Sequence, residues 1–197
     1  MEELFQLLNG YHPLPVELQV VLMNQLPKEI HRANKPILDA GQVCEWLGFV
    51  EKGLLKIYYE LEDGTEKVVW FLKEGDVIGS MKSFYKGTPS RLCIRTMEET
   101  TLRKIRKPDL YHLYQKFTEF NVNARLLTEE YYSRCEDHLI LQIIPLEERI
   151  KVLEADHPWM LKDSRIKDYM IADYIGIHRS TLSRYRNGKK YRGREKS

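Results

Sequence analysis

Residues 109–142 lie within the stretch from Asp109 to Ile144, which is the longest of the chain without glycine or proline. Those two residues are the strongest breakers of a helix, and apolar side chains recur here at alternating spacings of three and four. The sequence therefore predicts one long helix over 109–142. Its apolar stripe consists of Leu113, Phe117, Phe120, Ala124, Leu127, Tyr131, Cys135 and His138.

A helix of this length has more apolar surface than one small domain can cover. Pairing with a second copy of the chain is the economical prediction. The residues expected in this dimer helix are Phe117, Phe120, Ala124, Leu127 and Tyr131. The alternative is that the stripe packs against the chain's own β domain.

The sequence before this helix shows two different patterns of residues. Residues 1–32 have leucines at helical spacing and are predicted to be helical. Residues 36–107 are rich in β-branched and aromatic side chains between turns that contain glycine, and they predict a small β-barrel or sandwich. The expected strands are 37–39, 45–50, 54–61, 67–72, 92–97 and 101–105. Asp63-Gly64 is the clearest hairpin turn, because both residues accept the backbone angles of tight turns.

After the helix, Pro145 is expected to end it and to form a hinge. The predicted domains are a β domain over 1–108, the dimerisation helix over 109–144 and a final domain over 145–197.

The final domain contains two short amphipathic patterns on either side of Gly176. Glycine permits a sharp turn, so residues 168–187 predict two helices hinged at this point. Leu182 and Tyr185 are the expected apolar anchors of the second helix. Its outward side chains, which could contact a nucleic acid, are Arg179, Ser180, Ser183, Arg184 and Arg186.

Positive charge is concentrated at this end of the chain. Residues 177–197 contain eight Lys or Arg and one acidic residue, whereas the whole chain has a net charge of +2. Clustered cations neutralise phosphates and steer a protein towards nucleic acid. For residues 188–197 alone, a solubilising basic tail explains the charge equally well.

The bulk composition is that of an ordinary globular protein, with 43% hydrophobic and 30% charged residues. No stretch predicts a secretory signal or a membrane span, so a cytoplasmic protein is expected. Cys44, Cys93 and Cys135 are odd in number and far apart, which favours reduced thiols. The histidines and cysteines show no metal-ligand spacing, and no nucleophile or phosphate-loop motif is present. Neither a metal nor an enzymatic activity is therefore expected.

Two segments carry a resemblance to a known family. Residues 75–84, Gly-Asp-Val-Ile-Gly-Ser-Met-Lys-Ser-Phe, resemble the opening of a phosphate-binding cassette, and residues 176–184 resemble a turn and recognition helix. Their order, with hairpins and a long helix between them, resembles the Crp/Fnr family of bacterial transcription regulators. The resemblance implies an α+β fold. It would comprise an N-terminal β-barrel of the cyclic-nucleotide-binding jelly-roll type with flanking helices, a long dimerisation helix, and a C-terminal helix-turn-helix domain similar to a winged helix.

The resemblance also implies roles for individual residues. Arg179 and Arg184 stand where the family has arginines that read bases, and Ser180 stands where catabolite-activator-like members have a glutamate. Arginine pairs with guanine edges, whereas a serine hydroxyl is less selective, so the DNA site must differ. Thr181 and Ser183 are expected to contact phosphates.

The cassette departs from the cyclic-AMP pattern. Ser80, which follows Gly79, replaces the ribose-binding glutamate, and Ser90 stands at the arginine position, with Arg91 one residue later. A shift of one residue along a strand reverses the direction of a side chain, so Arg91 is a poor substitute. These four residues are the expected effector pocket, but the departures argue against cyclic AMP and leave the effector unidentified.

The implied partners are double-stranded DNA at a near-palindromic operator, a second copy of the chain, RNA polymerase and a small-molecule effector. A competing interpretation is a ligand-binding or protein-interaction module whose DNA-binding domain is vestigial.

Overall fold

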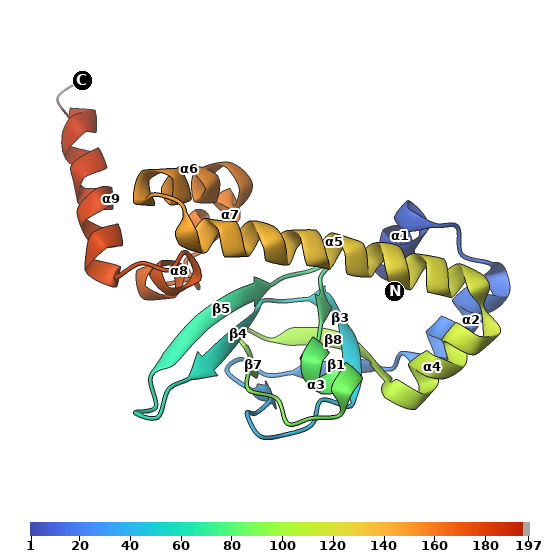
Figure 1. Cartoon of the computed structure of the whole chain (residues 1–197). Helices are drawn as coiled ribbons and strands as arrows, with labels where there is room; N and C mark the ends of the chain where they lie inside the picture. The colour runs from blue at the N-terminus through green and yellow to red at the C-terminus, as the bar shows by residue number, and fades with distance from the viewer. Residues whose placement is uncertain (195–197) are drawn as a thin grey trace. The chain divides into compact units, whose positions relative to one another are not determined.

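The computed structural model describes the backbone of residues 1–194 and the side chains of residues 1–188 (Figure 1). Its contacts group the chain into two compact units. The first comprises Met1–Glu66 and Trp70–Tyr132, and the second comprises Lys67–Val69 with the chain from Ser133 onward. The division falls inside a helix, between the boundaries at residue 108 and Pro145 that the sequence suggests.

The first unit opens with two helices, α1 (Glu2–Tyr11) and α2 (Val16–Gln25). The strands between residues 28 and 106 then form two four-stranded antiparallel sheets, in the orders β1-β8-β3-β6 and β2-β7-β4-β5. Their bounds are β1 (Lys28–His31), β2 (Pro36–Leu38), β3 (Trp46–Lys52), β4 (Leu55–Glu60), β5 (Glu66–Leu72), β6 (Val77–Ile78), β7 (Cys93–Thr96) and β8 (Thr100–Arg106). Helix α3 (Met81–Lys86) follows β6.

The two sheets share one hydrophobic core. Phe49 and Leu102 from the first sheet and Leu55 and Ile94 from the second belong to the same buried cluster. The expected closed barrel is therefore corrected to two facing sheets, since no ladder between the described strands joins an edge of one sheet to an edge of the other. Each fully buried leucine or phenylalanine in such a core contributes about 1.5–3 kcal/mol.

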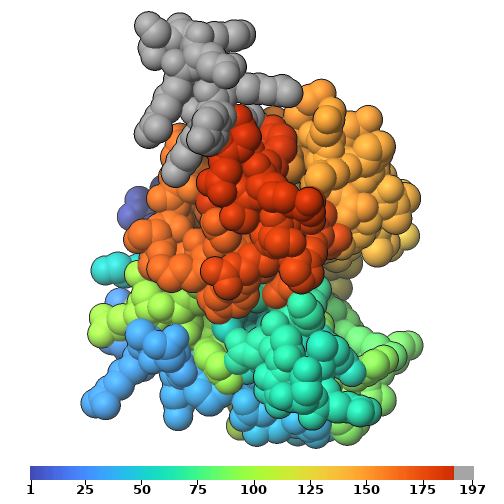
Figure 2. All heavy atoms as spheres, turned by 90° about the vertical axis from the view of Figure 1, so that its left-hand side faces the viewer, coloured from blue at the N-terminus to red at the C-terminus, as the bar shows by residue number. Residues whose placement is uncertain are grey.

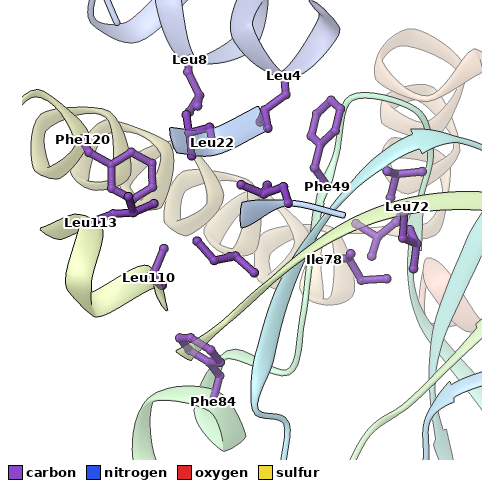
Figure 3. Close-up of a cluster of buried hydrophobic side chains, with 14 of the residues drawn as sticks. Leu4, Leu8, Leu22, Phe49, Leu72, Ile78, Phe84, Leu110, Leu113 and Phe120 are labelled. Atoms are coloured by element: carbon purple, nitrogen blue, oxygen red, sulfur yellow. The ribbon is translucent and has the colours of Figure 1, made fainter. Parts of the chain in front are cut away.

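The helices on either side of the strands complete this core. Figure 3 shows Leu8, Leu22, Leu113 and Phe120 gathered together, although they come from four different helices. The helical pattern of the leucines near the N-terminus is thus explained by burial against the rest of the first unit.

The hairpin at Asp63-Gly64 is confirmed. Strands β4 and β5 are neighbours, and Gly64 between them has a φ of +80°. The Asp63 carboxylate accepts a hydrogen bond from the Thr65 N–H at 2.8 Å, which closes the turn.

Two strands were not expected from the sequence. Lys28–His31 was assigned to a helical region but forms β1, which pairs with β8, and Val77–Ile78 forms β6, which pairs with β3. Both strands are short and gain their hydrogen bonds from partners that are distant in sequence. Local periodicity carries no signal of such pairing.

The prediction of one helix over 109–142 is wrong, because two helices form. Helix α4 (Lys107–Lys116) and helix α5 (Thr118–Ile143) are separated by Phe117, whose backbone is extended, with φ −124° and ψ 110°. The Asn121 amide donates hydrogen bonds to the Tyr114 and Phe117 carbonyl oxygens, at 2.6 and 3.0 Å. The first bond satisfies a carbonyl at the end of α4, and the second adds to the Asn121 N–H, which donates to the Phe117 carbonyl at 3.4 Å.

The second unit is helical from Pro145 onward. The end of α5 at Ile143 and the start of α6 after Pro145 agree with the expected hinge. The helices are α6 (Leu146–Asp156), α7 (Pro158–Lys162), α8 (Asp168–Tyr174) and α9 (Arg179–Arg194). The backbone described between residues 145 and 194 contains no strand, so the winged-helix part of the fold expectation is corrected.

Candidate nucleic-acid interface

The bend between α8 and α9 is built around Gly176. Its φ of +67° lies in the left-handed region, which glycine adopts at little cost. The Ile177 N–H donates to the Ala172 carbonyl at 2.9 Å, and the Gly176 N–H donates to the Asp173 carbonyl at 3.1 Å. This pair of bonds is a Schellman motif, a common way for a helix to end. Gly176 therefore stops α8, as the sequence predicted.

His178 starts the next helix. Its ring Nδ1 accepts a hydrogen bond from the Ser180 N–H at 3.3 Å and lies 2.8 Å from the Ser180 hydroxyl. The side chain thus caps one of the free amides at the start of α9. Sequence reasoning missed this role, because histidine is not among the residues usually found at the N-cap of a helix.

The residues predicted to contact DNA lie in the first turns of α9. Arg179, Ser180, Ser183 and Arg184 are exposed, and Thr181 is half-buried. Leu182, by contrast, is 1% exposed and anchors the helix. The space-filling view shows atoms from this red part of the chain at the surface (Figure 2). Both arginines therefore point away from the packed interior and into the solvent. There they can reach phosphates and base edges.

One predicted outward arginine has another role. Arg186 is half-buried, and its guanidinium forms an ion pair with Asp168 at the start of α8. This bond ties α9 to α8, so Arg186 is less available for DNA. The basic side chains beyond it, Lys189, Lys190, Arg192, Arg194 and Lys196, lie outside the described residues.

The cassette residues Ser80 and Ser90 are brought together in the first unit. Both are buried, and their hydroxyl oxygens are 2.9 Å apart. Ser90 Oγ also accepts a hydrogen bond from the Leu92 N–H at 3.1 Å. At Gly79, an added Cβ would lie 2.6 Å from Leu47 Cδ2, so the backbone is closely packed. The hydroxyl groups at the two positions that depart from the cyclic-AMP pattern are thus hydrogen-bonded to each other.

Arg91 does not join them. It is exposed, and its guanidinium lies 5.6 Å from the centre of the Tyr59 ring. The buried cation in this sheet is instead Lys56, which pairs with Glu66, and Arg95 binds the other oxygen of that carboxylate at 2.6 Å. The structure therefore places Ser80 and Ser90 in the interior and Arg91 on the surface.

The stripe predicted to form a dimer seam faces the chain's own first unit. Phe117 and Phe120 belong to the core of that unit, and the Tyr131 hydroxyl accepts a hydrogen bond from the Val77 N–H at 2.6 Å. Ala124 and Leu127 are half-buried. Phe117 and Phe120 are therefore taken up by the core of the first unit, as the alternative held, whereas the seam stays a prediction for Ala124, Leu127 and Tyr131, which are half-buried.

A different face of α5 is apolar and exposed. Tyr132, Leu139 and Ile143 are 73%, 68% and 79% exposed, and their spacing of seven and four residues places them on one side of the helix. We call these three residues the exposed stripe. Its signal was present in the sequence, but it was weaker than that of the continuous stripe, which lies about 100° away around the helix.

Among the described residues there is no group of three or more His, Cys, Asp or Glu side chains that could hold a metal ion. Within the same residues, no helix has both the length and the apolarity to cross a membrane. Cys44 and Cys93 are buried and Cys135 is exposed, all three as free thiols.

Two half-buried histidines flank Tyr174 in the second unit. The His138 ring centre lies 4.6 Å from that of Tyr174, and His157 Nε2 lies 3.3 Å from the Tyr174 hydroxyl. Burial lowers the pKa of both histidines below 6.5. The charge of His157 lowers the pKa of His138 further. For His157, the charge of Asp156 raises the pKa and that of Arg134 lowers it. Burial also raises the pKa of Tyr174 to about 12.

We expect the protein to lose stability as the pH falls below about 6.5. A lowered pKa in the folded state means that the unfolded chain takes up protons first, so acid favours unfolding. Urea unfolding between pH 7.5 and 5 measures the effect. The change His138→Gln is expected to flatten this pH dependence, whereas His112→Gln, at an exposed position, should leave it unchanged. Equal slopes in the two variants would contradict the assignment.

Comparison with known proteins supports the architecture. Residues 28–117 match the cyclic nucleotide-binding domain family. The sequence is 35% identical over 68 residues to the cAMP-activated global transcriptional regulator Vfr of Pseudomonas aeruginosa, a match that spans 32% of each chain. The structure is similar to that of FixK2 from Bradyrhizobium japonicum, with a TM-score of 0.71 at 20% identity over 85% of this chain and 86% of that one. It is also similar to a putative Crp/Fnr regulator from Eubacterium rectale, with a TM-score of 0.69 at 17% identity over 93% and 89% of the two chains.

Two facing sheets with a cassette, a long helix and a basic C-terminal pair of helices define a cyclic nucleotide-binding-like domain followed by a helical domain. The sequence and structural matches agree with this arrangement. Residues 28–117 thus match the cyclic nucleotide-binding domain family, and the fold of the chain as a whole is similar to that of solved Crp/Fnr-type regulators.

Proposed function

We propose that this protein is a sequence-specific DNA-binding regulator that acts as a homodimer on a near-palindromic operator. The observation that carries the proposal is the start of α9, where Arg179 and Arg184 are exposed while Leu182 fixes the helix from beneath. A helix that presents arginines and hydroxyls beyond a sharp turn fits the major groove of DNA.

The exposed side chains divide by chemistry. A guanidinium can donate two hydrogen bonds to a guanine edge, which is worth about 1–3 kcal/mol of discrimination, so Arg179 and Arg184 are proposed to read bases. Ser180 lacks the charge to select cytosine, and its hydroxyl also lies against the His178 ring. Thr181 and Ser183 are proposed to bind phosphates and so to set the register of the helix.

Dimerisation places two copies of α9 on one duplex. A two-fold symmetric dimer recognises half-sites one helical turn apart, about 34 Å. Because the side of α5 that includes Tyr131 is engaged within the first unit, we propose that the exposed stripe is the contact between copies. Three large apolar side chains in water favour such pairing.

The change Leu139→Glu, in the centre of the exposed stripe, is expected to dissociate the dimer. An unpaired charge buried at an interface costs about 3–5 kcal/mol, which raises the dissociation constant by a factor of about 100 or more. Sedimentation equilibrium measures this constant. The matched control Ser133→Glu adds the same charge to an exposed position on another side of α5. A dimer that survives Leu139→Glu unchanged would exclude this contact.

Cyclic AMP is not expected to be the effector. The Ser80 and Ser90 hydroxyls are buried and lie within hydrogen-bond distance of each other, and neither supplies a charge for a cyclic phosphate. Calorimetric titration of the protein with cyclic AMP should therefore detect no saturable binding. Saturable heat at micromolar concentrations would show that the site opens and accepts the nucleotide.

Selection of bound sequences from a random DNA pool tests the proposed function as a whole. The expected product is a symmetric motif whose affinity falls steeply with salt, because phosphate contacts release counterions. A pool that stays random after repeated selection at physiological salt would refute sequence-specific binding. The slope of affinity against salt also gives the approximate number of phosphate contacts.

A further inference from the structure

The end of α8 leaves backbone carbonyls to be satisfied. The Schellman motif uses the carbonyls of Ala172 and Asp173. The next three carbonyl oxygens, those of Tyr174, Ile175 and Gly176, lie at the start of the bend that leads to α9. Tyr174 and Ile175 are buried, so at this end of the helix a carbonyl without a partner would be costly.

Two side chains from outside α8 supply the hydrogen bonds. The Gln142 amide, in the last turn of α5, donates to the Tyr174 carbonyl at 2.5 Å. The Arg149 guanidinium, on α6, donates through Nη1 to the Ile175 and Gly176 carbonyls, at 3.1 and 2.9 Å. We call Gln142 and Arg149 the carbonyl clamp.

Arg149 also holds the end of α5. Its Nε donates to the Ile144 carbonyl at 2.7 Å, just before Pro145. One guanidinium thus joins the hinge after α5 to the bend before α9. Only arginine has enough donors in a fixed plane to reach three carbonyls at once, and lysine would reach them as a single point charge.

The packing around the clamp is tight. A Cβ added at Gly176 would lie 2.0 Å from Gln142 Oε1 and 3.3 Å from Arg149 Nη1. Both side chains are therefore pressed against the glycine. Any change in their position must move the bend or break their hydrogen bonds.

We infer that Gln142 and Arg149 are positioning residues for DNA recognition. They fix the bend, and through it the direction in which the first turn of α9 presents Arg179 and Arg184. The inference rests on the proposed function. The proposed role differs from a direct contact with DNA, because Arg149 Nε and Nη1 donate their hydrogen bonds to backbone oxygens within the second unit.

The experiment compares four variants of the full chain, Arg149→Lys among them, on the selected operator and on a scrambled duplex. Arg149→Ala and Gln142→Ala remove the clamp. Lys151→Ala removes the same charge as Arg149→Ala from an exposed position on α6 and serves as the control. The readouts are the ratio of operator to scrambled affinity and the amide hydrogen exchange of Gly176 and Ile177.

The expected result is a ratio at least 10-fold lower in Arg149→Ala, a smaller drop in Gln142→Ala, and no change in Lys151→Ala. Exchange at Gly176 and Ile177 should accelerate in the two clamp variants while the buried core of α6 stays protected. That protection separates positioning from general unfolding. An Arg149→Lys variant should recover only part of the ratio.

An Arg149→Ala protein with the same ratio as Lys151→Ala would overturn the inference. So would an equal loss of affinity on both duplexes, which is the behaviour of a phosphate contact. If the unaltered protein shows no sequence preference, the proposed function fails instead. Hydrogen exchange then decides alone whether the clamp holds the bend, and unchanged exchange in Arg149→Ala would refute it.

Discussion

Replacing Arg179 or Arg184 with alanine is expected to lower operator affinity about 5- to 100-fold, because each guanidinium that pairs with a guanine supplies about 1–3 kcal/mol. Preference at one base pair in each half-site should relax with each change. Both residues are exposed, so folding should be unaffected. Equilibrium binding to the selected operator and to single-base variants of it measures both effects.

The control for charge is Lys151→Ala, which removes one cation elsewhere in the same unit and should weaken all duplexes slightly and equally. Retention of full operator affinity in the Arg179→Ala, Arg184→Ala double variant would favour the interpretation of a vestigial DNA-binding domain.

The change Gly53→Ala is expected to destabilise the β domain by about 3–5 kcal/mol. Gly53 has a φ of +113°, which alanine adopts only with strain. An added Cβ would also lie 2.6 Å from Thr100 Oγ1 and 2.8 Å from the Thr100 Cα, where a buried strand leaves no room. Urea unfolding followed by circular dichroism measures the loss.

Gly64→Ala is a matched control for this prediction. Gly64 also has a positive φ, +80°, but an added Cβ would meet nothing within 4 Å. Its cost should be limited to the backbone strain, about 1–2 kcal/mol. If both variants lose the same stability, the close approach of Thr100 contributes nothing.

The features predicted correctly are those with a local cause. The hairpin at Asp63-Gly64 and the bend at Gly176 depend on residues whose own backbone preferences decide the structure. The end of α5 before Pro145 has the same kind of cause. Leu182 could be placed inside because helical spacing alone separates it from the arginines beside it.

The features that were missed depend on distant partners. Strand β1 exists because β8 offers it a ladder, and the break at Phe117 exists because that ring is buried in the β core. Pro27 ends the helical stretch before β1 but does not by itself predict a strand, and no glycine or proline marks the break at Phe117. The clamp residue Arg149 lies 27 residues before Gly176 in sequence, so no spacing rule would pair them.

The candidate sites show the same division. The motif placed Ser80 and Ser90 in one cassette, but only the fold shows that their hydroxyls meet. Of the apolar stripe predicted for the long helix, Leu113, Phe117 and Phe120 are buried, and they are covered by the first unit of the same chain. Periodicity identifies a face that must be covered and gives no information on what covers it.

The meeting of Ser80 and Ser90 has a consequence for how this part of the molecule responds to its surroundings. Hydroxyl groups carry no charge and do not ionise in the range where proteins fold, so their attraction is untouched by dissolved ions. A glutamate and an arginine in the same two places would have tied the shape of the cassette to acidity and ionic strength. With two alcohols, the interior here keeps one form across conditions under which the rest of the chain changes its protonation.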